Sequence, residues 1–317
     1  MAALFFCGGT HVETQGLASL HQGLQHFQKN IMPKQTIYIT SAADLSVKNS
    51  QLQIAFPDRN TSYLRSIEDL GVLIIDHHSA HLTVPLLNLL AQHNVAVVFC
   101  NEQHIPTTML MDLESNSMQA KHIRAQLDAG KPMCKQVWKQ VVEHKIQNQS
   151  ALLEKLGKGK DPLQRYYTTV KSGDSTNREG VAAKVYWSTL FGKQFIRDRF
   201  GTPPNNLLNY GYAILRSSVA RAIMDAGLLP LVGVFHRSYY DALPLADDLM
   251  EPYRPFIDEK VYSLQLRGIG EIGPTVKKEI LELFYNELSQ EQVSATAHSL
   301  ARIFEREGNV MYYPNLR

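Results

Sequence analysis

Three side chains from separate segments of the chain are of types that bind divalent metal ions. Glu179 opens a helical segment, His236 lies 57 positions later, and Glu251 lies 15 positions after that. Two carboxylates and one imidazole suit Mg²⁺ or Mn²⁺, and the imidazole favours Mn²⁺ slightly. A divalent ion can lower the pKa of a hydroxyl, polarise a phosphoryl oxygen and stabilise a leaving oxygen. If the fold brings the three together, they form a candidate phosphodiester-transfer site.

Glu179 also has a structural interpretation. Thr176 followed three residues later by Glu179 is the pattern of a capping box, in which Glu179 would satisfy an amide at the helix start. Gly180 and Ala182-Ala183 leave space beside the carboxylate, as a crowded metal or phosphate site requires. The pattern alone leaves both interpretations open.

The other two ligand candidates, His236 and Glu251, also have structural interpretations. His236 follows an apolar run, and a single histidine in that position is more often a hydrogen-bonded structural residue. Asp248 and Glu251 have the spacing that places two side chains on one helix face. Pro252 disfavours helical geometry at Glu251, so we expect a break or kink there.

A second candidate site is the triplet Asp76-His77-His78, which follows a buried strand pattern. It resembles the metal-binding triplet of the DHH phosphoesterase family, whose members hold two manganese ions at strand ends. That family also needs an aspartate pair after an earlier strand, which is missing here, and its glycine-rich histidine motif has its only counterpart at residues 8–11. The favoured interpretation is that the triplet caps a helix that begins near Ala80.

The elements that must position these residues divide the chain into two parts. Alternating or continuous apolar residues predict strands over residues 36–40, 45–47, 51–56, 71–75 and 95–100, and a helix over residues 82–93. From about Asn116 the pattern is helical, with helices expected over residues 118–129, 133–156, 162–168, 179–190, 206–226, 254–264, 276–288 and 292–307. We therefore expect an α+β protein with a small β-rich N-terminal domain (32–115) and a larger all-helical catalytic domain (116–317).

Residues 1–31 show no clear periodicity, and a strand pattern begins just after Met32. We expect them to be an extension, either disordered or the result of an over-long assignment of the start. They lack the basic flank and long apolar core of a signal peptide. The three cysteines, Cys7, Cys100 and Cys134, have no metal-ligand spacing, so we expect free thiols in a reducing cytoplasm.

The net charge of +2 conceals an uneven distribution. Residues 32–115 carry 4 basic and 8 acidic side chains, whereas residues 116–317 carry 27 and 21. The helical part is therefore the better candidate for binding a polyanion such as nucleic acid. No apolar run approaches the roughly 20 residues of a membrane span.

Taken together, the motifs resemble a known family. They are Asn177-Arg178-Glu179-Gly180 with Tyr186-Trp187, Asn209-Tyr210-Gly211-Tyr212, the segment ending in His236, the stretch from Asp248 to Pro255, residues 94–106 and Tyr312-Tyr313-Pro314. In order and spacing they resemble the CRISPR-associated protein one family, the integrase and endonuclease of spacer acquisition. The resemblance covers roughly residues 32–317, and Glu251, where many branches have Asp, is similar to the type II branch.

This resemblance implies that Glu179, His236 and Glu251 are both the catalytic residues and the metal ligands, and that Asp248 matches a further acidic position found in some branches. It implies insertion of spacer DNA into the repeat array by attack of a 3′-hydroxyl on a phosphodiester, with Mg²⁺ or Mn²⁺. It also implies a prokaryotic, cytoplasmic homodimer that binds double-stranded DNA and CRISPR-associated protein two.

Four arginines flank the motifs and are candidates for phosphate contacts, although some should instead pair with the acidic residues. They are Arg178, Arg216, Arg237 and Arg254. Two other functions stay open: a DHH-type manganese phosphoesterase centred on Asp76 and His77, and a DNA-binding scaffold without catalytic activity.

Overall fold

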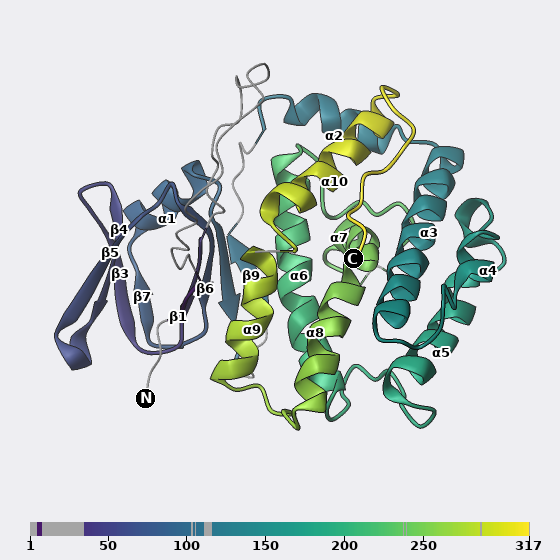
Figure 1. Ribbon diagram of the computed structural model, residues 1–317. Coiled ribbons are helices and arrows are strands. Elements are labelled where there is room, and N and C mark those ends of the chain that lie inside the picture. The colour runs from purple at the N-terminus through teal and green to yellow at the C-terminus, as the bar shows by residue number, and fades with distance from the viewer. Residues whose placement is uncertain are drawn as a thin grey trace, which may run out of the picture.

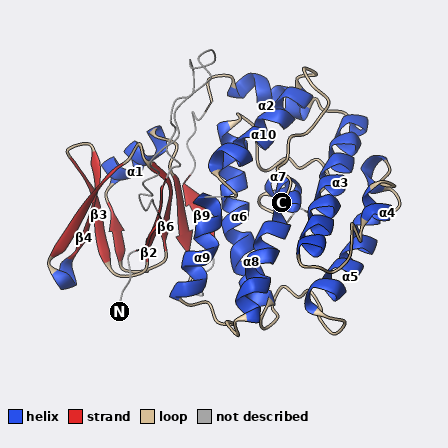
Figure 2. Cartoon of the chain, in the orientation of Figure 1, coloured by secondary structure: helices blue, strands red, loops and turns tan. Residues whose placement is uncertain are grey.

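The computed structural model describes residues 5–7, 35–102, 104, 106–110, 116–236, 238, 240–285 and 287–316. A β-rich region with one helix lies beside a larger helical region (Figures 1 and 2). The expected α+β fold class is therefore confirmed. The boundary between the two domains at residues 115 and 116 stays a prediction, because residues 111–115 lie outside the described part.

The β-rich region contains two sheets and helix α1 (Val84–Gln92). The first sheet has the strand order β1-β2-β6-β8-β9, and β2, β6 and β8 are parallel. Its strands are β1 (Phe5–Cys7), β2 (Gln35–Ile39), β6 (Leu70–Ile75), β8 (Ala96–Cys100) and β9 (Pro106–Leu110). The second sheet has the order β5-β4-β3-β7, with β3 (Ala43–Lys48), β4 (Gln51–Phe56), β5 (Thr61–Ser66) and β7 (Ala80–Leu82).

The first sheet is buried on both faces, which explains its nearly continuous apolar strands. Ile37, Leu73 and Val97 point into a core shared with the second sheet and α1. The alternate residues, among them Tyr38 and Ile74, belong to the core of the helical region. Because successive side chains of a strand point to opposite faces, the first sheet contributes to both cores and so connects the two regions.

Nine helices of four or more residues are described in the helical region. They are α2 (Gln119–Leu127), α3 (Lys131–Lys155), α4 (Gln164–Tyr167), α5 (Arg178–Phe191), α6 (Asn205–Asp225), α7 (Pro244–Met250), α8 (Arg254–Leu266), α9 (Pro274–Tyr285) and α10 (Gln290–Phe304). Proline lies in the first turn of α3, α7 and α8, where its missing amide costs no hydrogen bond. Helices α6 and α9 lie against the first sheet (Figure 1).

Most expected elements are present, and the differences are local. Residues 5–7 form β1, which pairs antiparallel with β2, and the interpretation of residues 1–31 as an extension stays a prediction. The rest of that extension lies outside the described residues. Strand β9 follows the last strand that we expected, at residues 95–100, and α7 lies between the helices that we expected over residues 206–226 and 254–264. None of the described helices combines the length and apolar character that a bilayer span requires.

Candidate active site

The N-terminus of α5 presents Glu179. Asn177, with a positive φ of 51°, is the N-cap, and its side chain accepts a hydrogen bond from the amide of Gly180 at 3.2 Å. The carboxylate of Asp174 accepts the amides of Arg178 and Glu179 at 2.7 and 3.0 Å. Other residues therefore satisfy the first amides of this helix, and the side chain of Glu179 is available for a different partner.

The capping-box interpretation of Glu179 is consequently wrong, because Asn177 rather than Thr176 caps the helix. A Cβ atom at Gly180 would lie 2.7 Å from Oδ1 of Asn177, so this glycine makes room for the cap.

Glu251 lies at the junction of α7 and α8, in a 3-10 turn (Glu251–Tyr253). The expected break is present, but Glu251 itself keeps helical dihedral angles of −54° and −45° in spite of Pro252. Its side chain is 5% exposed and lies between two cations: Oε1 is 2.9 Å from Arg254, and Oε2 is 2.5 Å from Nζ of Lys145. Burial alone raises the pKa of Glu251, but Arg254 and Lys145 outweigh this effect and hold the pKa below its usual value.

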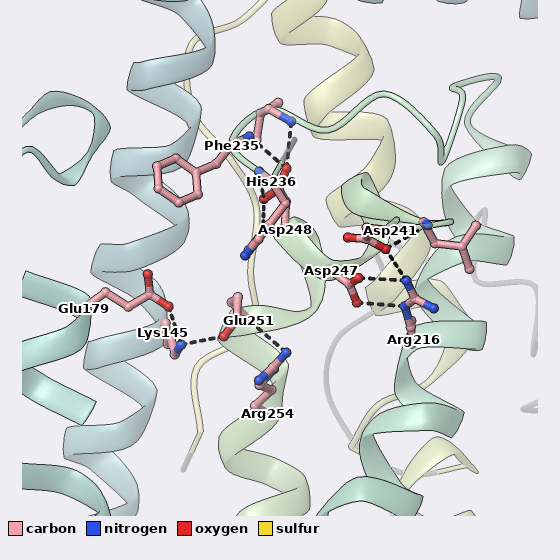
Figure 3. Close-up of polar contacts among 12 residues, drawn as sticks. Lys145, Glu179, Arg216, Phe235, His236, Asp241, Asp247, Asp248, Glu251 and Arg254 are labelled. Carbon is pink, nitrogen blue, oxygen red and sulfur yellow. Dashed lines mark hydrogen bonds and ion pairs between the residues drawn. The ribbon is translucent and has the colours of Figure 1, made fainter. Parts of the chain in front are cut away.

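Lys145 joins the two glutamates. It lies in the middle of α3, and its Nζ is 2.6 Å from Oε1 of Glu179 as well as 2.5 Å from Oε2 of Glu251 (Figure 3). Burial lowers the pKa of this ammonium group, but the attraction of Glu251 and Glu179 exceeds that effect and raises the pKa. One buried cation therefore draws together carboxylates from two helices.

His236 lies in the segment between α6 and α7, where residues 234–236 surround Asp248 of α7. The fully buried carboxylate of Asp248 accepts the amides of Val234, Phe235 and His236 at 2.7, 3.0 and 3.1 Å. It also lies 2.7 Å from Nδ1 of His236. This hydrogen bond raises the pKa of the imidazole, and Glu251 contributes to the shift through its charge.

Two further contacts set the position of this loop. A Cβ atom at Gly233 would lie 2.6 Å from the carbonyl oxygen of His236 and 2.9 Å from Oδ2 of Asp248, so only glycine allows the loop to close around the carboxylate. The ring of Phe235 stacks on Trp138 of α3 with centroids 4.1 Å apart, and Trp138 also meets the edge of His236. Helix α3 thus supports both His236 and, through Lys145, the glutamates.

The described residues contain no group of three His, Cys, Asp or Glu side chains already arranged to hold a metal ion. The donor set nevertheless fits one. Glu179 and Glu251 already converge on a single cation, the ammonium group of Lys145. Oε2 of Glu251 has no partner with hydrogen-bond geometry among the described residues, although Lys145 lies close to it. Because Asp248 occupies Nδ1 of His236, Nε2 is the imidazole nitrogen left for a metal.

The flanking arginines have different partners. Arg216 binds Asp247 through two nitrogen–oxygen contacts of 2.8 Å and Asp241 at 2.5 Å, which ties α7 to the loop that precedes it. Arg254 pairs with Glu251. Both are thus partners of acidic residues, whereas the buried Nε of Arg178 has no hydrogen-bond partner in the described structure, and Arg237 lies outside it.

The triplet Asp76-His77-His78 does not cap a helix, because strand β7 follows it and α1 begins only at Val84. Asp76 is buried, and its Oδ2 lies 2.5 Å both from the hydroxyl of Tyr38 and from Nζ of Lys277 in α9. Burial alone raises the pKa of Asp76, but the hydrogen bonds from Lys277 and Tyr38 lower it overall. This aspartate therefore joins the first sheet to the helical region.

Lys145 and Trp138 were not recognised from the sequence as parts of the site. A signal for Lys145 does exist: Trp138, Val141 and Val142 precede it at the spacings that place all four on one helix face. Because the other three are buried, a lysine at this position must find a carboxylate in the interior.

Comparison with known proteins identifies the family. The family model described as CRISPR associated protein Cas1 matches residues 37–273. A curated relative, the CRISPR-associated endonuclease Cas1 of Neisseria meningitidis, is 34% identical over 265 residues, which cover 82% of this chain and 86% of the relative. The CRISPR-associated endonuclease Cas1 1 of Pyrobaculum aerophilum is 29% identical over 66% of this chain and 75% of its own length.

Solved structures share the fold. A casposase bound to its integration product has a TM-score of 0.71 at 23% identity, covering 85% of this chain and 90% of the casposase. A CAS1 protein from Thermotoga maritima has a TM-score of 0.68 at 20% identity, with coverage of 85% and 97%. The order of Glu179, His236 and Glu251, the convergence of their segments and the match over most of the chain agree: this protein belongs to the Cas1 family of CRISPR-associated endonucleases.

Proposed function

We propose that this protein is a divalent-metal-dependent DNA integrase and endonuclease that inserts spacer DNA into a CRISPR repeat array. One observation carries the proposal: Glu179 and Glu251, 72 positions apart in the chain, each bring a carboxylate oxygen to within 2.6 Å of one atom, Nζ of Lys145. Glu251 is 5% and Glu179 25% exposed, and desolvation of these charges offsets much of their attraction to Lys145, so the cluster adds little to stability. We infer that its purpose is instead to hold a metal ion against DNA.

In this proposal Glu179, Glu251 and His236 hold Mg²⁺ or Mn²⁺. When bound, the ion supplies charge stabilisation for the phosphoryl oxygens and lowers the pKa of a hydroxyl. Asp248 keeps a proton on Nδ1 of His236, so that Nε2 presents its lone pair. Arg254 keeps Glu251 ionised within the interior.

The reaction balances without an energy source, because one phosphodiester replaces another. The oxygen of a DNA 3′-hydroxyl forms a bond to the phosphorus of the repeat while the bond from that phosphorus to the repeat's own 3′-oxygen breaks. The attacking hydroxyl loses one proton to solvent, and the departing 3′-oxygen takes one up to become a new 3′-hydroxyl. With water as the attacking group, the same arrangement hydrolyses a DNA end. Both reactions require the same charge stabilisation at the phosphorus.

The fold neighbours support a proposal for the partners. Fold neighbours include a casposase bound to an integration product and a Cas6-RT-Cas1–Cas2 complex, which has a TM-score of 0.66 at 18% identity, covering 93% of this chain and 37% of that chain. We infer that this chain binds double-stranded DNA, forms a homodimer and assembles with CRISPR-associated protein two. The glutamate at position 251 supports its placement in the type II branch.

The test is strand transfer of a short DNA duplex into a repeat-containing plasmid, with Mn²⁺ and the small partner protein. Native protein is compared with Glu179→Ala and with His77→Ala as the matched variant outside the site. We expect Glu179→Ala to reduce the rate by about 100-fold or more, which corresponds to roughly 3 kcal/mol of lost charge stabilisation. His77→Ala should retain activity.

Two outcomes would contradict the proposal. Activity that survives Glu179→Ala but not His77→Ala would place the chemistry in the β-rich region, as in a DHH-type phosphoesterase. DNA binding without any metal-dependent reaction, by native protein and variants alike, would indicate a scaffold.

A further inference from the structure

We propose that Lys145 and the divalent cation compete for one position, the space between the carboxylates of Glu179 and Glu251, so that metal binding displaces the ammonium group. This inference rests on the proposed metal-dependent function. It assigns Lys145 as a positioning residue. Its ammonium group holds the carboxylates of Glu179 and Glu251 together before metal binds and moves out from between them when metal binds.

The distances make the two cations mutually exclusive. Nζ of Lys145 lies 2.6 Å from Oε1 of Glu179 and 2.5 Å from Oε2 of Glu251. Oxygen ligands bind Mg²⁺ at about 2.0–2.1 Å, which is shorter than both of these contacts. A metal ion bound by the same two oxygens therefore leaves no room for Nζ between them.

The charges explain why a lysine is needed there. The side chains of Lys145, Glu251 and Glu179 are 10%, 5% and 25% exposed, and two such poorly hydrated carboxylates side by side repel each other without a cation. Lys145 supplies that cation. With a divalent ion added, an ammonium group in the same place would face two positive charges at very short range in a poorly hydrated site.

The two cations beside Glu251 differ in how firmly they are held. The guanidinium group of Arg254 lies 2.9 Å from Oε1 and 4.8 Å from the centre of the Tyr212 ring. Lys145 reaches Oε2 of Glu251 and donates a hydrogen bond to Glu179 from the end of a flexible four-carbon stem, and its ammonium group has no aromatic contact among the described residues. Arg254 can therefore keep Glu251 ionised while Lys145 turns away.

Removing the competing cation should strengthen metal binding. In Lys145→Met, the uncompensated carboxylates should bind Mn²⁺ about 10-fold more tightly than in the native chain, or better. The same variant should have a lower Tm without metal and a larger increase in Tm when Mn²⁺ is added. A merely structural lysine would lower Tm but would not improve metal affinity.

The experiment is isothermal titration of the full-length protein with Mn²⁺, comparing native chain, Lys145→Met and Lys155→Met. Lys155 is the matched control, because it lies on the same helix and pairs with a glutamate, Glu259, at 2.7 Å. It is 44% exposed and lies ten positions after Lys145, away from Glu179 and Glu251. We expect tighter Mn²⁺ binding for Lys145→Met alone. If Lys145→Met binds Mn²⁺ with the same affinity as the native chain, or more weakly, the inference is overturned. In that case the proposed function still stands, provided that the native chain shows saturable Mn²⁺ binding.

A second measurement does not depend on the folding of the variant. In a crystal structure of the native protein grown with Mn²⁺, Nζ of Lys145 should lie beyond hydrogen-bond distance of at least one carboxylate. An ammonium group that still contacts both Glu179 and Glu251 beside a bound ion overturns the inference. Absence of saturable Mn²⁺ binding by both native protein and Lys145→Met overturns the metal-dependent function as well.

Discussion

The carboxylate of Asp248 accepts hydrogen bonds from both the ring and the amide of His236, at 2.7 and 3.1 Å. The amides of Val234 and Phe235 point to the same carboxylate. A buried aspartate thus fixes the loop, the orientation of the imidazole and the nitrogen that carries its proton. We therefore infer that Asp248 positions the imidazole that the proposed function assigns as a metal ligand, and is not a ligand itself.

Replacing Asp248 with Asn should lower Mn²⁺ affinity by about 10–100-fold, because the imidazole loses the charged acceptor that orients it. The measurement is isothermal titration with Mn²⁺, together with the strand-transfer rate. Asp58→Asn, at an exposed turn of the β-rich region, is the control. Mn²⁺ affinity within twofold of the native value in Asp248→Asn would show that His236 needs no such support.

Arg216 should contribute to stability and not to DNA affinity, since its guanidinium group is occupied by Asp247 and Asp241. We expect Arg216→Ala to lower the free energy of unfolding by about 1–3 kcal/mol, measured in urea, because two carboxylates lose their charged partner. The salt dependence of DNA binding should stay unchanged in this variant. A decrease of about 0.9 in the slope of log affinity against log salt would reveal a phosphate contact instead.

Asp258 should make the stability of the protein dependent on pH. Burial raises the pKa of this carboxyl to about 6 from 3.8, in spite of hydrogen bonds from the hydroxyls of Tyr186 and Tyr212. A folded pKa above the unfolded value means that this group contributes most below pH 3.8 and loses its contribution as the pH rises through about 6.

Native protein should therefore lose stability relative to Asp258→Asn between about pH 4 and pH 7, by on the order of 2–4 kcal/mol. Urea unfolding of both proteins at several pH values measures the difference. Glu259→Gln, at the next position but partly exposed, serves as the comparison. A constant difference between native protein and Asp258→Asn across this range would mean that Asp258 keeps an ordinary pKa.

Lys277→Met should destabilise the protein by about 3–5 kcal/mol, because it leaves the carboxylate of Asp76 buried without its cation. Lys278→Met is the matched control: its ammonium group is exposed and 3.9 Å from Glu282, so its loss should cost less than about 1 kcal/mol. Urea unfolding measures both. Equal effects of the two substitutions would contradict the proposed connection between the sheet and α9.

Features that depend on neighbours in the chain could be predicted. The longer helices α2, α3, α5, α6, α8, α9 and α10 follow the periodicity of their apolar residues, and the strands β2, β4, β6 and β8 follow apolar alternation or continuity. The motifs around Glu179, His236 and Glu251 could be recognised because they are defined by residue types in a fixed order, which can be read from the sequence directly.

The strands that escaped prediction carry little apolar signal. Strand β5 is mostly exposed and exists because its backbone pairs with β4 from Thr61 to Ser66. Strand β9 pairs with β8 in the same way, at the edge of the first sheet. Backbone hydrogen bonds across a sheet leave no pattern in the side chains, and the seven residues of α7 are too few to show a helical period.

The sequence by itself determined the family, the fold class and the three candidate ligands, because each depends on residue types in a fixed order. Only the tertiary structure decided which charges meet. It placed Lys145 between Glu179 and Glu251, gave Asp248 to His236, and engaged Asp76 with Lys277 across the two regions. Ionic contacts between residues distant in the chain depend on how helices and sheets pack. The role of a buried charged residue can be assigned only when its partner is known, because the partner determines the energetic cost of burying the charge.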